Sequence, residues 1–158
     1  MFREMLRSRD QLPEEECRRI LKQELRGVLA VQGDDGYPYA MPLNHYYEEE
    51  DGRIYFHSGP VGHKVDAIRR CARACFCVYD RGFRREGEWA LNIRSVIVFG
   101  RIEVVEDRDR VYEIARRLSR KFTDDEAYIE REVRTYGPTT LMFCLVPEHM
   151  TGKLVHEE

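Results

Sequence analysis

Hydrophobic and polar positions along the chain follow two periods, and these periods predict helices and strands. Residues 13–25 place apolar side chains at helical spacing, and residues 27–31 form a short apolar run after a glycine. Two further strands are predicted at 37–47 and 53–57, with the polar stretch 48–52 between them as a hairpin tip. The first third of the chain is therefore expected to be a helix followed by a β-meander.

The rest of the chain continues with three more helices and three more strands. The pattern predicts helices at 64–70, 108–121 and 124–134, and strands at 74–79, 94–105 and 139–146, the last ended by Pro147. Strict alternation of strand and helix is missing, which argues against a doubly wound parallel sheet. The six strands favour a small antiparallel barrel with peripheral helices, built as a single domain over residues 1–158.

Composition limits the class of protein. The chain carries 26 basic and 29 acidic residues, a net charge of −3, so a nucleic acid is not expected as the main partner. Hydrophobic residues make up 42%, which is typical of a soluble globular protein. No apolar run approaches the roughly 20 residues of a membrane helix, and the N-terminus lacks the apolar core of a secretory signal. We therefore expect a cytoplasmic protein without a membrane partner.

Five cysteines in a chain without a secretory signal suggest reduced thiols. Cys71, Cys75 and Cys77 form a C-x3-C-x-C pattern, which is not a common zinc spacing and has no fourth ligand nearby in sequence. Free cysteine also behaves as a small buried hydrophobic residue. Core packing is therefore favoured over metal binding, and no metal site is predicted.

The sharpest local signal is the segment 57–64, His-Ser-Gly-Pro-Val-Gly-His-Lys, between a predicted strand and a predicted helix. A helix N-terminus offers free N–H groups and the positive end of its dipole to a phosphate. Gly62 allows close approach of the backbone, Ser58 offers a hydroxyl, and His63 and Lys64 supply positive charge. The segment predicts a phosphate site, with an ordinary strand–turn–helix connection as the alternative.

The chain also resembles a known family. Five segments carry the resemblance in the same order, namely 1–5, 36–43, 54–64, 94–100 and 149–153. They are similar to the pyridoxamine 5′-phosphate oxidase-like superfamily, and within it to the Nim-type 5-nitroimidazole resistance proteins. The resemblance implies a mainly β fold with peripheral helices, the six-stranded antiparallel FMN-binding split barrel. It also implies a homodimer with two equivalent cofactor sites at the subunit interface.

Carried over position by position, the resemblance implies three cofactor-binding segments. The isoalloxazine ring of FMN would be lined, largely through backbone groups, by Met41, Pro42, Leu43 and Asn44. The ribityl chain and phosphate would be bordered by His57 and Ser58 and held by Gly62, His63 and Lys64. From the partner subunit, the cofactor would be reached by Arg94 and Ser95.

One position departs from the pyridoxamine phosphate oxidases, because His63 stands where their loop offers an arginine beside the lysine. Their C-terminal substrate-binding arginine and histidine pattern is not evident either. The resemblance therefore favours a reductase of nitroimidazole-type or related small aromatic compounds over a pyridoxamine phosphate oxidase. Electrons would come from NAD(P)H or another donor, and a nicotinamide would dock transiently because the chain has no G-x-G-x-x-G.

His57 has three possible roles. A histidine at a strand end beside a cofactor can be a catalytic proton donor with a near-neutral pKa. It can be an axial ligand, since some split-barrel relatives bind haem in place of flavin. It can also be a structural histidine that faces the phosphate. A non-catalytic flavin or haem carrier or sensor therefore remains the alternative to a reductase.

Overall fold

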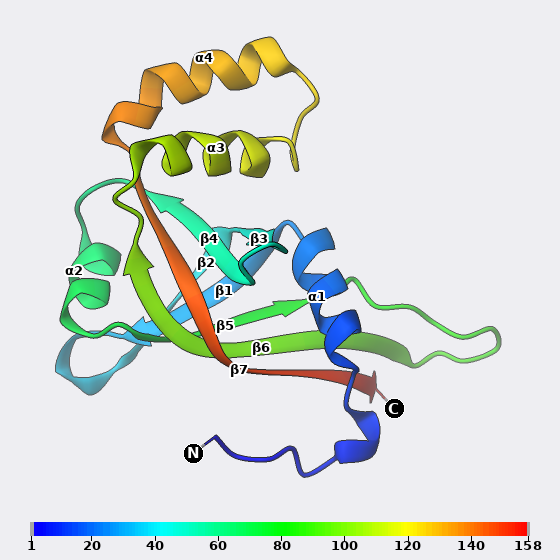
Figure 1. Ribbon diagram of the computed structural model, residues 1–158. Helices are drawn as coiled ribbons and strands as arrows, with labels where there is room; N and C mark the ends of the chain where they lie inside the picture. The colour runs from blue at the N-terminus through cyan, green and yellow to red at the C-terminus, as the bar shows by residue number, and fades with distance from the viewer. Residues whose placement is uncertain (1, 158) are drawn as a thin grey trace.

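One antiparallel sheet organises the computed structural model, which describes residues 2–157 apart from the side chain of residue 157 (Figure 1). Its seven strands are β1 (Arg26–Gln32), β2 (Pro38–Asn44), β3 (Tyr46–Glu48), β4 (Arg53–Ser58), β5 (Arg73–Tyr79), β6 (Leu91–Val104) and β7 (Leu141–Glu157). Four α-helices accompany them, α1 (Glu14–Gln23), α2 (His63–Arg70), α3 (Arg108–Ser119) and α4 (Glu126–Tyr136).

The strands lie in the order β2-β1-β5-β6-β7-β4-β3, and every neighbouring pair is antiparallel. The sheet curls so far that β2, at one edge, approaches β4 near the other edge. This arrangement confirms the prediction of a mainly β, antiparallel split barrel with peripheral helices.

The sheet has seven strands where six were predicted, because the segment 37–47 divides at His45. The backbone N–H of His45 leaves the ladder and donates to the Leu25 carbonyl at 3.4 Å. The fully buried ring places Nε2 2.7 Å from the Leu21 carbonyl, next to Phe76. Turning this ring into the core separates β2 from β3.

The prediction that Pro147 ends the last strand is wrong. β7 continues to residue 157 and pairs with β6 from Phe143 to its end. A register shift between Phe99 and Gly100 leaves Glu148 without a partner in the ladder. Such a bulge accommodates a proline, which cannot donate a ladder hydrogen bond. The residues after Pro147 therefore extend β7 and form a long antiparallel pair with β6.

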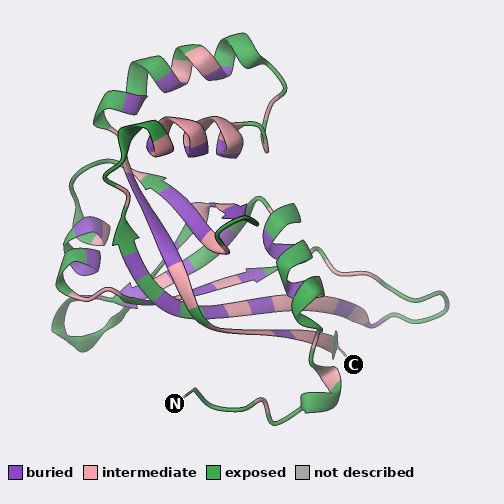
Figure 2. Ribbon diagram, in the orientation of Figure 1, coloured by how far each residue is buried: buried purple, intermediate pink, exposed green. Residues whose placement is uncertain are grey.

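Alternation along the strands separates an inner face from an outer face (Figure 2). On β5, Phe76 and Val78 point into the barrel, whereas Cys75 and Cys77 point outward and are half-buried. Cys17 and Cys144 are buried, and Cys71 is half-buried. All five are free thiols, and the core packing expected for Cys71, Cys75 and Cys77 is wrong, because all three are only half-buried.

Helices α3 and α4 form a pair on the outside of β4 and β7 (Figures 1 and 2). Helix α3 begins where the Asp107 carboxylate accepts from the Asp109 N–H at 3.0 Å, and α4 begins at an equivalent Asp125 cap. Val111 and Ile114 of α3 pack on Tyr55 of β4 in a second core cluster. Helix α4 in turn packs on α3.

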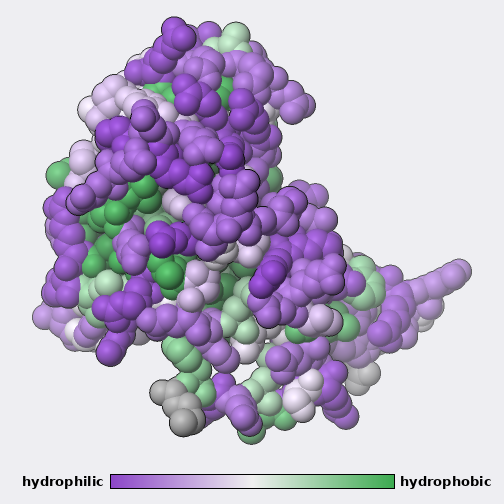
Figure 3. Space-filling view, in the orientation of Figure 1, coloured by the Kyte–Doolittle hydropathy of each residue, from purple (hydrophilic) through white to green (hydrophobic). Residues whose placement is uncertain are grey.

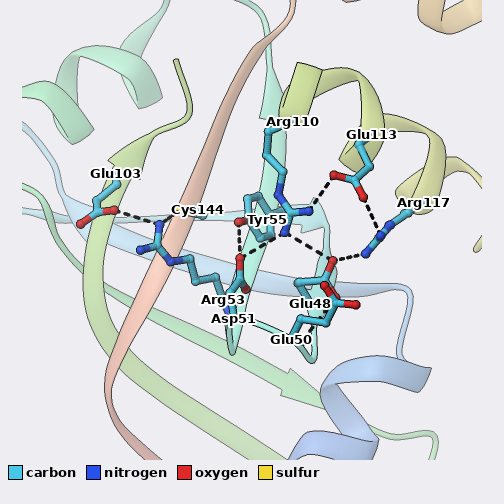
Figure 4. Close-up of polar contacts among 10 residues, drawn as sticks. All are labelled: Glu48, Glu50, Asp51, Arg53, Tyr55, Glu103, Arg110, Glu113, Arg117 and Cys144. Atoms are coloured by element: carbon cyan, nitrogen blue, oxygen red, sulfur yellow. Dashed lines mark hydrogen bonds and ion pairs between the residues drawn. The ribbon is translucent and has the colours of Figure 1, made fainter. Parts of the chain in front are cut away.

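An ion-pair cluster fixes α3 to the β3–β4 hairpin (Figure 4). At its centre the Glu48 carboxylate, only 4% exposed, accepts hydrogen bonds from Arg110 and Arg117. Arg110 also contacts Asp51 at 3.2 Å, and the Tyr55 hydroxyl donates to the same carboxylate at 2.6 Å. The cluster therefore sets the position of α3 and α4 relative to the end of β4.

No helix within residues 2–157 combines the length and the apolar character that a bilayer crossing requires. Across the same residues, no group of three or more histidine, cysteine, aspartate or glutamate side chains is arranged to hold a metal ion.

Candidate functional site

The segment 57–64 joins the end of β4 to the start of α2, as the sequence predicts. Gly62 caps α2 with a φ of +123°, a backbone conformation that favours glycine. The first backbone bond of the helix runs from the Asp66 N–H to the Gly62 carbonyl at 3.1 Å, and no side chain caps the turn. Within the described chain, the N–H groups of residues 63–65 thus remain free for an anion.

Lys64 supplies the positive charge of this turn. The residue is half-buried, its Nζ lies 6.0 Å from the centroid of the Phe143 ring, and none of the ion pairs among residues 2–157 includes it. Burial lowers the pKa of Lys64, because the charged form loses solvation. A cation that is partly desolvated and lacks a carboxylate partner would gain from a bound phosphate.

His57 lies beside Lys64 at the end of β4. Solvent reaches part of its ring, yet partial burial and, second, the charge of Lys64 lower the pKa of His57. Both effects favour the neutral ring in the absence of an anion. A bound phosphate would raise this pKa again, since a nearby negative charge favours the imidazolium.

The His63 side chain turns away from the loop toward β2. Its ring stacks on Tyr39 with centroids 4.1 Å apart, and Nε2 lies 3.4 Å from the Asp34 carboxylate. Arg70, the last residue of α2, pairs with the same carboxylate at 2.9 Å. These contacts hold α2 against the β1–β2 turn and leave the His63 backbone N–H as the group that faces an anion.

The predicted ring-lining segment Met41–Asn44 forms the second half of β2. Met41 is buried, Leu43 packs against the core and Pro42 is exposed on the outer face. The Asn44 side-chain oxygen accepts from Arg26 at 2.7 Å. Among the described strands β2 pairs only with β1, so its other edge presents unpaired backbone groups toward the opening near β4. The structure thus brings this segment and the segment 57–64 to one side of the barrel.

The third predicted segment, Arg94 and Ser95, lies far from the other two in the structure. Arg94 sits near the start of β6, whereas the far end of β6, at Val104, pairs with β7 next to the end of β4. The Arg94 guanidinium pairs with Asp80 at 3.1 Å and stacks over Phe83. Ser95 lies opposite Tyr79 on the outer face. A single chain therefore does not unite Arg94 and Ser95 with the other two segments.

A cavity of about 460 Å³ adjoins the segment 57–64, and sequence analysis did not predict it. His57, Ser58, Gly59 and Pro60 form one wall, and α3, α4 and the turn after α4 form the other. Its buried lining includes Leu118, Ile129 and Val133. Figure 3 shows hydrophobic surface gathered between α2 and the α3–α4 pair. The helical pattern alone indicated which side of each helix is apolar, but not that two helices and a loop enclose a space.

Comparison with known proteins identifies the family. The sequence family described as pyridoxamine 5′-phosphate oxidase matches residues 13–154, and the chain belongs to this family. No curated protein matches the chain.

Several solved structures share the fold. A Bacteroides thetaiotaomicron protein named for 5-nitroimidazole antibiotic resistance is 20% identical, with 93% of this chain and 87% of that chain covered and a TM-score of 0.76. A Mesorhizobium loti protein described as FAD-binding is 25% identical, with 92% and 96% covered and a TM-score of 0.64. A Mycobacterium smegmatis protein described as binding FAD and haem is 22% identical, with 92% and 73% covered and a TM-score of 0.74.

Proposed function

We propose that this protein is an FMN-binding flavoprotein that reduces nitroimidazole-type or related small aromatic compounds, with electrons from NAD(P)H or another donor. One observation carries the proposal, namely the unpaired, half-buried Lys64 beside the free N–H groups of α2. A positive charge and free N–H donors lie together there, as phosphate binding requires. The family membership and the structural relatives named for flavin binding agree with it.

Different residues of the chain would hold different parts of the cofactor. Lys64, the Ser58 hydroxyl and the N–H groups of the first turn of α2 would bind the phosphate. The free edge of β2 at Met41–Asn44 would meet the flavin ring through backbone groups. When bound, flavin supplies two-electron chemistry at its ring. His57 would deliver a proton to the substrate, because a bound phosphate would raise the pKa that burial and, second, the charge of Lys64 lower.

The proposed function includes a homodimer with the cofactor sites at its interface. Four neighbours on the outer face of the sheet, Pro42, Val28, Cys77 and Ile97, form a row across four strands. Val28 and Pro42 are exposed and the other two are half-buried. We call these four residues the outer apolar row. Burying this row against a second copy would place Pro42, a proposed ring-lining residue, at the interface.

A haem protein is the second candidate, and His57 favours it. Its lowered pKa keeps the imidazole neutral, which is the form that binds iron, and it borders a partly apolar cavity. The protein would then be a haem or flavin carrier or sensor without turnover. A Soret band that disappears in His57→Ala would favour this candidate.

Turnover tests the reductase directly. Flavin-saturated protein is mixed anaerobically with NADH or NADPH and a 5-nitroimidazole, and loss of the nitro absorbance is followed. We expect turnover that requires both the donor and the flavin, with a smaller rate and a changed pH profile in His57→Gln. Saturated protein that turns over with neither nicotinamide nor a chemical reductant such as dithionite contradicts the reductase.

A further inference from the structure

The cavity between the segment 57–60 and helices α3 and α4 has no assigned role in the function proposed above. We propose that it is the substrate pocket, and that the substrate is an aromatic compound that carries a positively charged amino group. This inference rests on the proposed function, because it names the class of aromatic compound that the flavoprotein would reduce. All residues that line the cavity belong to one chain, so binding to it can also be measured without flavin.

One wall of the cavity is shared with the proposed cofactor site. His57 and Ser58 line the cavity, and the same two residues would border the bound flavin. A compound in the cavity therefore lies against His57, which the proposed function makes the proton donor. This contact would place the reducible group of the compound at His57 and the rest of the molecule toward α3 and α4.

The interior of the cavity suits a flat aromatic ring. Leu118 of α3 and Ile129 and Val133 of α4 line the cavity and are buried. Tyr128 and Tyr136 also line it and are 44% and 58% exposed, so their rings are available for stacking. The volume of about 460 Å³ lies within the range of roughly 300–1,000 Å³ that small-molecule sites occupy.

The charge that lines the cavity is negative. Glu132 lies between Tyr128 and Tyr136 at four-residue spacing on α4, and all three line the cavity. Glu132 is half-buried, and no hydrogen bond or ion pair among residues 2–157 includes it. Among the described residues, neither a lysine nor an arginine lines the cavity. A partly desolvated carboxylate beside aromatic rings favours an ammonium group.

The arginines beside this wall have partners outside the cavity. Arg108 donates hydrogen bonds to the carbonyl oxygens of Gly137 and Thr140. The guanidinium carbon of Arg131 lies 5.3 Å from the centroid of the Tyr128 ring, which leaves the ring of Tyr136 for the cation of a ligand. An anionic compound would therefore find no positive partner in the cavity and would be repelled by Glu132.

Three nitroaromatic probes of similar size test the inference. 4-Nitrobenzylamine carries a positive charge at pH 7, 4-nitrobenzyl alcohol is neutral, and 4-nitrobenzoate is negative. Their binding to the flavin-free protein is measured by calorimetric titration. We expect the amine to bind about tenfold more tightly than the alcohol, and the benzoate to bind most weakly. The KM values of the FMN-loaded protein should follow the same order.

Two variants assign the preference to Glu132. Glu132→Gln should remove the tenfold preference for the amine and leave the affinity for the alcohol unchanged, which also shows that the variant is folded. Glu126→Gln removes the same charge from the same helix, outside the cavity, and should keep the preference.

Equal affinities for the amine and the alcohol would overturn the inference, and so would a preference that persists in Glu132→Gln. Tight binding of the amine to flavin-free protein without a lower KM would also overturn it, because the cavity would then not be the substrate pocket. If the FMN-loaded protein reduces none of the probes, the proposed function fails and the substrate role fails with it. The titrations without flavin distinguish that failure from a cavity that does not bind the amine.

Discussion

Lys64 is the residue on which phosphate binding depends most, because it is the unpaired cation beside the free N–H groups of α2. Replacing it with glutamine removes a charge-assisted hydrogen bond. We expect Lys64→Gln to weaken the affinity for FMN by about 10- to 100-fold, measured by calorimetric titration. Riboflavin, which lacks the phosphate, should bind both proteins equally. Lys22→Gln, whose ammonium pairs with Glu49 on the surface, is the matched control and should behave as wild type. Equal FMN affinity in Lys64→Gln would remove this residue from the site.

His45 makes the stability of the protein depend on acid pH. Burial, and second the charge of Lys121, lower the pKa of His45 to about 3. Its Nδ1 has no hydrogen-bond partner within residues 2–157. The folded state therefore needs the neutral ring, while the unfolded chain binds a proton near pH 6.5. The contribution is complete above pH 6.5 and is lost progressively as the pH falls toward 3.

We expect the free energy of unfolding to fall by about 1.4 kcal/mol per pH unit from His45 alone, between pH 6 and 4. Urea unfolding of wild type and His45→Gln over this range measures the difference. The glutamine can still donate to the Leu21 carbonyl but does not titrate. Carboxylates lose stabilisation in both proteins, so only the difference in slope reports on His45. Parallel pH profiles would contradict this account.

At the scale of elements, the ion-pair cluster around Glu48 holds the α3–α4 pair in place. Glu48→Gln would remove the buried negative charge that Arg110 and Arg117 share and replace one acceptor oxygen with an NH2 donor. We expect a loss of about 3 kcal/mol in the free energy of unfolding, measured by chemical denaturation. Glu126→Gln breaks an exposed pair with Arg120 on the same helices and should leave the midpoint unchanged. If Glu48→Gln unfolded at the same denaturant concentration as wild type, core packing alone would position α3.

Periodicity predicted the elements whose burial is regular and failed where a single residue interrupts it. The helices follow apolar stripes, and the fold class follows from the order of the strands. The break at His45 was not predictable, because the sequence does not distinguish a buried, neutral histidine from an exposed one. Pro147 was misleading, since a bulge that accommodates it depends on the register with β6. The cavity depends on how α4 packs on α3, which no local pattern encodes.

At the scale of the whole molecule, the outer apolar row predicts self-association. Val28 is already 36% exposed, so Val28→Lys should not disturb the core. We expect the wild-type protein to sediment as a dimer and Val28→Lys as a monomer with a weakened flavin site. Val104→Lys, at an exposed apolar position outside this row, is the control and should remain dimeric. A monomeric wild-type protein would contradict the dimer.

The candidate site was predictable from the sequence in part. The segments 41–44 and 57–64 lie together because the barrel curls β2 toward β4. Arg94 and Ser95 lie at the distant end of β6, and only a second copy could bring them to the site. The sequence pattern indicates residue types at element ends, whereas distances between elements arise from the curvature of the sheet.

The central claim is that the turn between β4 and α2 binds a flavin phosphate. The visible absorbance spectrum of the purified protein tests it most directly, recorded with wild type and with Lys64→Gln after equal incubation with FMN and removal of free ligand. We predict the two bands of an oxidised, bound flavin in wild type and their strong reduction in the variant. A wild-type spectrum without flavin bands, or with a Soret band in their place, would contradict the account.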